Sequence, residues 1–161
     1  MSTLRTQLRR EISTNLIPVI KGRGFDGPDS IKGNSILHEF SKQEDYRKLH
    51  LSIQMEKHQK PRFIISLDIE PSCGYDEFYK VGGTLEQGRL RQKNGKSTAS
   101  WFRADHTFFE KLVKKKYNKT KFAVESCISF FDEVDGWWTE PKQTQHIDYL
   151  SLNFSGTSND K

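Results

Sequence analysis

The residues best suited to chemistry are one histidine and two carboxylates, His50, Asp68 and Glu70, on two consecutive segments that alternate apolar and polar residues. If these segments pair as antiparallel strands, His50 lies opposite Asp68 or Glu70, depending on the register, with Cβ atoms about 4.5–5.5 Å apart. A histidine beside a carboxylate can act as a general base or as a metal ligand. A hydrolase that uses His50 with Asp68 or Glu70 is therefore one candidate function.

The same three residues also have a purely structural explanation. Antiparallel sheets commonly leave one face in water, where opposite charges pair without a catalytic role. Gln54 and Glu56 share the polar side of the second segment. Glu56 lies about 20 Å along the strand from His50, so these two side chains cannot bind one metal ion. We therefore favour a solvated face of charge pairs, with no catalytic residue, no metal ion and no cofactor.

Three segments carry this alternation, at residues 35–40, 48–56 and 63–70. Period-two alternation predicts an antiparallel meander with one buried face. We expect the inward side chains to pack together against the N-terminal helix; in the second and third strands they include Leu51, Ile53, Ile65 and Leu67. His38 falls on the apolar side of the first segment, between Ile36 and Phe40, and a hydrogen-bonded core histidine is favoured there over a functional one.

Helical periodicity frames this meander at both ends of the chain. A stripe at four-residue spacing, Leu4, Leu8, Ile12 and Leu16, predicts an amphipathic N-terminal helix that Pro18 kinks or ends. Asp105 is a good N-cap for a second helix, which places four apolar residues inward: Phe108, Phe109, Leu112 and Val113. A third begins near residue 121 with its own apolar stripe, Val124, Ile128, Phe131 and Val134, and Gly136 as its stop.

The elements together predict an α+β fold. Residues 84–91 and 147–154 can add strands, which gives an antiparallel meander sheet of four or more strands packed on amphipathic helices. The N-terminal helix comes first and two helices lie near the C-terminus. We expect one domain over residues 1–161, with a frayed tail from about residue 155.

Composition narrows the class of protein. The 161 residues are 34% hydrophobic, which is enough for a folded core, and their formal net charge of +5 permits an anionic partner without demanding one. No apolar run approaches the ~20 residues that span a bilayer, and the first residues lack the apolar core of a secretory signal. The cysteines, Cys73 and Cys127, make no disulfide framework, which favours a reduced cytoplasmic protein without a membrane partner.

The densest basic run lies at residues 111–121. On a helix, Lys111, Lys114 and Lys115 share one face and can contact phosphates. A solvated face near the negative end of the helix dipole explains the run better, and no aromatic residues interleave with the lysines as a stacking platform requires. Weak nucleic-acid binding is therefore an alternative function.

Three further motifs have functional and ordinary explanations. Trp137 and Trp138 can form an exposed anchor for a protein partner, although capping of the core is favoured. Cys73 has no histidine near it in sequence to activate it as a nucleophile. Residues 94–98 resemble the end of a phosphate-binding loop, but Leu90 stands where that loop needs a glycine.

The order of elements resembles a known family. An amphipathic helix runs into residues 18–25 and is followed by the meander, by Gly88-Arg89-Leu90, by the aromatic pair Trp101-Phe102 and by two helices. This order is similar, from Leu4 to Val134, to an uncharacterised bacterial family classed as a domain of unknown function (the family 4304 type). The resemblance implies this fold and a bacterial source, and it carries no activity.

These observations favour a small cytoplasmic bacterial protein that binds another macromolecule without catalysis. Another protein is the favoured partner, and a role beside a toxin, as an immunity or accessory protein, fits such a compact domain by association only. The alternatives are weak nucleic-acid binding through the lysine-rich helix and hydrolysis by the histidine–carboxylate pair.

Overall fold

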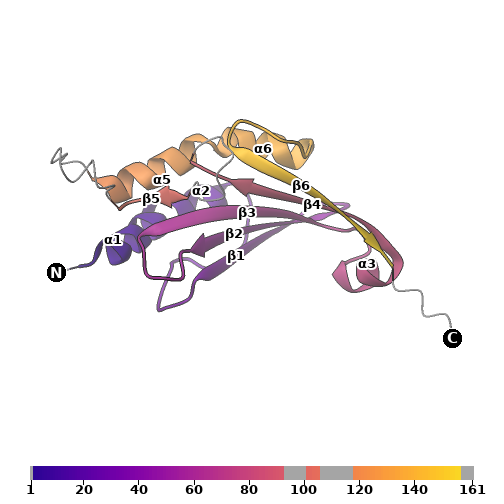
Figure 1. Cartoon of the computed structure of the whole chain (residues 1–161), viewed down its shortest axis with the longest axis horizontal. Coiled ribbons are helices and arrows are strands. Elements are labelled where there is room, and N and C mark those ends of the chain that lie inside the picture. Colours follow the sequence, from indigo (N-terminus) through magenta and orange to yellow (C-terminus); the bar gives the residue numbers. More distant parts are fainter. Residues whose placement is uncertain (1, 93–100, 106–117, 157–161) are drawn as a thin grey trace.

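One antiparallel sheet, with helices packed on one of its faces, organises the chain (Figure 1). The computed structural model describes residues 2–92, 101–105 and 118–156. Across the sheet the strands follow the order β1-β2-β3-β4-β6, and β5 pairs with the start of β3. The strands are β1 Leu37–Gln43, β2 Lys48–Met55, β3 Arg62–Glu70, β4 Gly82–Leu90, β5 Phe102–Arg103 and β6 Ile147–Ser155.

The helices confirm the predicted α+β class, with the N-terminal helix first and two helices near the C-terminus. They are α1 Leu4–Glu11, α2 Ile17–Gly22, α3 Tyr75–Val81, α5 Lys119–Ser129 and α6 Phe131–Thr139, and a π-helical turn, Ile12–Leu16, joins α1 to α2. The first pair and the last pair gather on the same side of the sheet, whereas α3 lies at the far end of the β4–β6 pair (Figure 1).

Pro18, predicted to kink or end the N-terminal helix, does not end it: helical structure continues through α2, and a π-helical turn directly precedes the proline's helix. Proline has no backbone N–H to donate and its ring crowds the carbonyl four residues earlier, which is that of Thr14. Thr14 lies within the π-helical turn, and such a widened turn can absorb a break in the regular hydrogen-bond ladder. Helix α2 then runs to Gly22, with Gly24 at φ +86° just beyond it.

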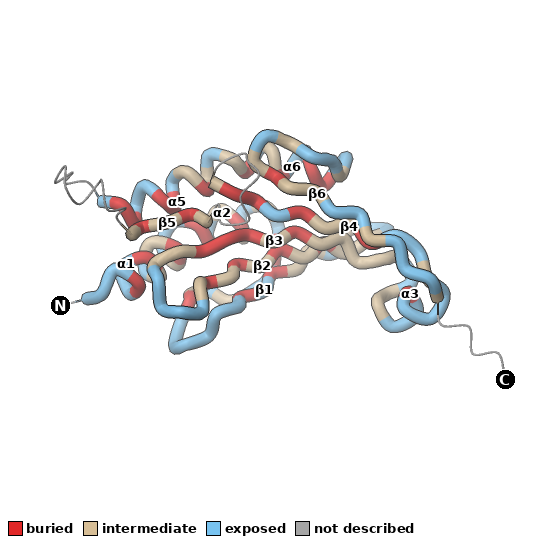
Figure 2. The backbone as a smooth tube through the Cα atoms, viewed as in Figure 1, coloured by how far each residue is buried: buried red, intermediate tan, exposed pale blue. Residues whose placement is uncertain are grey.

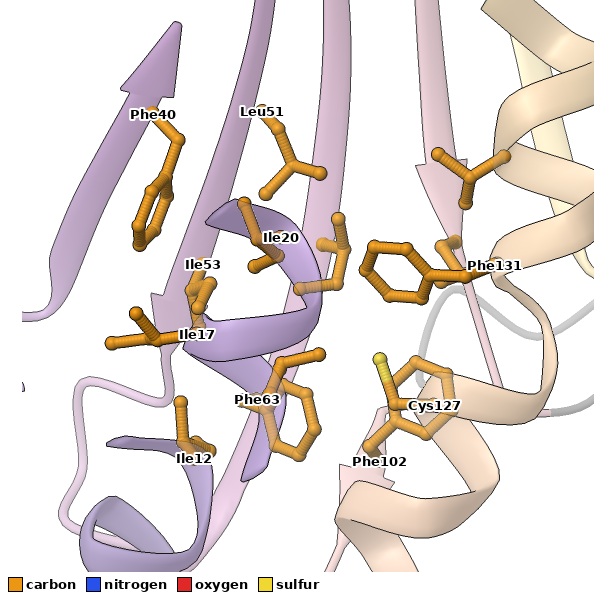
Figure 3. Packing of buried hydrophobic residues seen from close by; sticks show 14 of the residues in the cluster. Ile12, Ile17, Ile20, Phe40, Leu51, Ile53, Phe63, Phe102, Cys127 and Phe131 are labelled. Carbon is orange, nitrogen blue, oxygen red and sulfur yellow. The ribbon is translucent and has the colours of Figure 1, made fainter. Parts of the chain in front are cut away.

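The predicted inward face of the meander is the centre of the core. Leu51, Ile53, Ile65 and Leu67 are at most 1% exposed and belong to one buried cluster. Figure 3 shows Ile12, Ile17 and Ile20 of the N-terminal helical segments packed beside Ile53 and Phe63 of the sheet. Phe102, Cys127 and Phe131 come from the β5–α5–α6 side. We call the face of the sheet on which these helices pack the helix-covered face, and the opposite face of the sheet the open face.

Several local predictions differ from the structure. The segment predicted to begin near residue 121 forms two helices, α5 and α6, which break at Phe130. Gly136 lies inside α6 and does not stop it, because α6 continues to Thr139. Ile36 lies before β1 and is 40% exposed, whereas His38 and Phe40 point inward and are buried.

Helix α3 has no counterpart in the predicted elements. It is only seven residues long and lies between two glycines, Gly74 and Gly82, whose φ angles of +78° and +80° favour glycine. The helix predicted to follow Asp105, with Phe108, Phe109, Leu112 and Val113 inward, lies outside the described residues.

Candidate binding site on the open face of the sheet

The register of the sheet arranges the open face in rows of polar side chains. Strand β3 pairs with β2 on one side and β4 on the other, and β4 pairs with β6. One row crosses the four strands as His50, Asp68, Gln87 and Leu150, and the neighbouring row as Ser52, Ser66, Arg89 and Asp148. Side chains from four strands therefore share one surface.

The predicted histidine–carboxylate group lies on this face. Asp68 is directly opposite His50 in the register, while the His50 ring contacts Glu70, with 2.6 Å between Nε2 and Oε2. Both carboxylates named from the sequence therefore lie beside His50, one by strand pairing and one by side-chain contact. The partly buried side chains of His50 and Glu70 therefore form a hydrogen-bonded pair.

Tyr75, from the first turn of α3, covers this group. Its ring centroid lies 6.0 Å from that of His50. Burial, together with the negative charges of Asp68 and Glu70, raises the pKa of Tyr75 to about 12, so its hydroxyl stays protonated at neutral pH. Helix α3 thus closes one end of the open face over His50.

A hollow of about 520 Å³ opens beside this group, and its lining comes from β2, β3, β4, β6 and Arg91. Arg91 and Asp148 form an ion pair at its rim. Asp68 accepts a hydrogen bond of 2.7 Å from the Gln87 side-chain amide. Burial raises the pKa of Asp68, although the Gln87 hydrogen bond and the positive charges of His50 and Arg89 oppose the shift. The hollow therefore keeps a partly desolvated carboxylate.

Aromatic side chains gather at the α3 end of the open face. Phe78 is buried on Gly83 of β4, and its ring meets that of Phe154 of β6 edge-on, with centroids 5.5 Å apart. Tyr79 meets Phe154 at 5.7 Å and leaves half of its own surface exposed. We call Tyr75, Phe78, Tyr79 and Phe154 the aromatic border.

The other sequence candidates lie elsewhere. Trp137 and Trp138 are 1% and 6% exposed, and their burial favours capping of the core over an exposed anchor. Trp137 packs on Gly88, where an added Cβ would lie 2.9 Å from the indole ring. Lys111, Lys114 and Lys115 lie outside the described residues, as do residues 94–98.

The other histidine and cysteine candidates, His38 and Cys73, lie outside the hollow. His38 is buried, and burial lowers its pKa in spite of a hydrogen bond to the backbone of Ser35, so that the neutral ring suits the core. Cys73 is exposed and forms no disulfide. Cys127 is fully buried, and burial raises the pKa of its thiol. Over the described residues, no group of three or more His, Cys, Asp or Glu side chains is arranged to hold a metal ion.

The sequence patterns did not identify Tyr75, Gln87 and Arg89 as residues of this site. The alternation in residues 84–91 contained a usable signal, since it puts Leu85, Gln87 and Arg89 on one side of a strand. Pairing of that strand with β3 could not be read from the pattern, so Gln87 could not be placed beside Asp68.

Comparison of the chain with protein-family models, with curated proteins and with solved structures found no match. Similarity to the bacterial family described above therefore stays a prediction. Within the described ranges, no helix has the length and apolar character needed to cross a membrane.

Proposed function

We propose that this is a non-catalytic bacterial protein of the cytoplasm that binds another protein on the open face of its sheet. The observation that carries the proposal is the exposed apolar and aromatic surface beside a polar hollow. Leu150 is 51% exposed, Tyr79 50% and Phe154 37%, and all three lie at the β6–α3 side of the open face.

This combination suits a protein partner. Aromatic residues and arginine are enriched at protein interfaces, where a few anchors supply most of the binding energy. Tyr79 and Phe154 provide exposed ring surface held by mutual edge contact, and Arg89 provides an exposed guanidinium on the same face. These residues take the role that the sequence suggested for Trp137 and Trp138.

Hydrolysis remains the second candidate function because of the His50–Glu70 contact of 2.6 Å next to the hollow. A general base needs a water or hydroxyl within reach on the reacting side. Ser52 and Ser66 line the hollow, in the row next to His50. Nucleic-acid binding has less support, because acidic side chains such as Asp68, Glu70 and Asp148 occupy the open face together with the basic ones.

Affinity capture from native cell extract tests the proposal. The parent chain is compared with Tyr79→Ser and Leu150→Ser on the open face and with Leu4→Ser, whose parent residue is 42% exposed on α1, as the matched control. We expect a protein that is captured by the parent and by Leu4→Ser and lost from both open-face variants. Equal capture by all four chains, or capture that nuclease treatment abolishes, would contradict the proposal.

A further inference from the structure

Two charged side chains in the hollow on the open face, Asp68 and Arg89, form no ion pair with each other. Four charged residues line it, and two of them, Arg91 and Asp148, form an ion pair. Arg89 makes no hydrogen bond or ion pair with any described residue, and Asp68 is hydrogen-bonded only through the neutral Gln87 amide. A guanidinium and a carboxylate therefore face the same space without direct contact.

Their spacing follows from the strand pairing. Asp68 is directly opposite Gln87, and Arg89 is two residues farther along β4 on the same face. The Cα atoms of such diagonal neighbours are about 7–8 Å apart. Because the two side chains make no direct contact, a small group with a positive and a negative end can lie between them. One charge-assisted hydrogen bond of about 2.8 Å on each side would close the gap.

The neutral groups around the two charges are suited to the same ligand. Ser52 and Ser66 are direct partners across β2 and β3, and both line the hollow on the row that contains Arg89. Neither hydroxyl makes a hydrogen bond within the described part of the chain. Two hydroxyl donors beside a guanidinium suit a carboxylate, whereas Asp68 and the Gln87 amide oxygen suit an ammonium group.

We propose that this hollow binds a free α-amino acid through its zwitterionic head group. The carboxylate contacts Arg89 and the two serine hydroxyls, and the ammonium group contacts Asp68. The volume of about 520 Å³ falls within the usual range for small-molecule sites. Leu150, at the end of the Asp68 row, offers an apolar surface to the side chain of the ligand.

The state of Asp68 supports this assignment. Burial opposes ionisation of Asp68 and raises its pKa, and the fold nevertheless has a carboxyl group there. A cationic group in the hollow would remove that penalty, because an opposite charge nearby favours the ionised form. The hollow shares Arg89 and Leu150 with the surface proposed above for a protein partner, and the two ligands are distinguished by separate measurements.

The test is a titration of the full chain with each of the twenty standard amino acids, followed by ¹H–¹⁵N NMR. We expect saturable shifts at Ser66, Asp68, Gln87 and Arg89 for at least one of them, at concentrations up to about 10 mM. For that amino acid, the N-acetyl form lacks the ammonium charge and the amide form lacks the carboxylate. Each should bind at least about tenfold more weakly.

Matched variants identify the two contacts. Arg89→Gln and Asp68→Asn should each weaken binding at least about tenfold, while Arg10→Gln, an exposed arginine on α1, should bind as the parent does. Far-UV circular dichroism confirms that each variant is folded. The proposal is overturned if no amino acid gives saturable shifts, if the shifts lie outside the hollow, or if the N-acetyl form binds as tightly as the parent amino acid.

Discussion

The two faces of the sheet are built from the same strands and differ in almost every physical respect. On the helix-covered face, Leu51, Ile53, Ile65 and Leu67 are at most 1% exposed and are covered by four helices. On the open face, the residues between them are polar and half-buried. Figure 2 shows the buried residues concentrated along the middle of the strands, while the β4–β6 end beside α3 is largely exposed.

If the open face binds its ligands as proposed, this difference separates stability from recognition. Burial of apolar side chains on one face supplies the favourable free energy of folding. The other face contributes little of it and even includes Asp68, whose ionised form is opposed by burial. Residues that cost stability and lie in a hollow are typical of functional surfaces, where selection tolerates that cost. Each of the following predictions tests this division.

The largest effect is expected on the helix-covered face. Ile53→Ala and Leu67→Ala should each lower the free energy of unfolding by about 2–5 kcal/mol, because each leaves a cavity in the core. Ser52→Ala and Ser66→Ala, on the open face of the same strands, should change it by less than about 0.5 kcal/mol. Chemical denaturation measures all four. Similar losses on both faces would show that the division is wrong.

A substitution at Gly88 tests how closely Trp137 packs on the helix-covered face of the sheet. An added Cβ would lie 2.9 Å from the Trp137 ring and 3.2 Å from an Ile147 methyl group. Gly88→Ala should therefore cost about 1–3 kcal/mol through overpacking. Thermal and chemical unfolding measure the loss, and Gly22→Ala serves as a control, since an added Cβ at Gly22 meets nothing within 4 Å. A neutral Gly88→Ala would mean that Trp137 can shift at no cost.

A smaller, pH-dependent effect is expected from Asp105, which ties β5 to the start of β3. Burial opposes its ionisation, but hydrogen bonds from Arg62 and Arg103 outweigh burial and lower its pKa to about 2. A lowered carboxyl pKa stabilises the fold above the unfolded value of about 3.9, and this contribution is lost as the pH falls through the folded value.

Comparison of the parent with Asp105→Asn isolates that contribution. The parent should be more stable by about 1 kcal/mol above pH 4, a modest figure because the group is partly exposed to solvent. The difference should shrink as the pH falls toward 2. Urea denaturation at a series of pH values measures it, and a difference that does not vary with pH would exclude the two arginine contacts as its source.

The smallest effect is a gain in stability from Asp68→Asn. Since burial raises the pKa of Asp68, the ionised side chain destabilises the fold at neutral pH, and the penalty disappears as the pH falls below the raised value toward the unfolded one. The variant should gain less than about 1 kcal/mol at pH 7 and nothing at pH 3. Denaturation at both pH values is the measurement. A loss at pH 7 would show that Asp68 has a structural role.

The meander was predictable because its pattern is local. Alternation of apolar and polar residues identified β2 and β3 nearly to their ends and also identified their inward residues. That pattern allows only registers that differ by two residues. It therefore placed His50 beside Asp68 or Glu70 but could not decide between these two carboxylates. The structure pairs it with Asp68 and brings Glu70 into contact.

The rest of the site depends on contacts between segments distant in sequence. Arg89 reaches the hollow because β4 pairs with β3, and Asp148 because β6 pairs with β4. No local signal defines those registers. Helix α3 is too short for a periodic pattern, and Gly74 and Gly82 at its ends are typical of a turn as well. Gly136 was expected to end a helix, but packing of Trp137 and Trp138 in the core holds α6 together through it.

The place of β6 in the sheet also has a kinetic consequence. Strands β1, β2 and β3 are joined by short connections and can pair early, whereas β6 meets β4 only after residues 91–146 have been looped between them. Closing a long loop delays the contacts at its ends, so we expect β6 to dock last. Asp148 and Leu150 would then be the final residues to reach the hollow. A ligand of that hollow would consequently bind only chains that have finished folding, and its binding rate during refolding would report the last step.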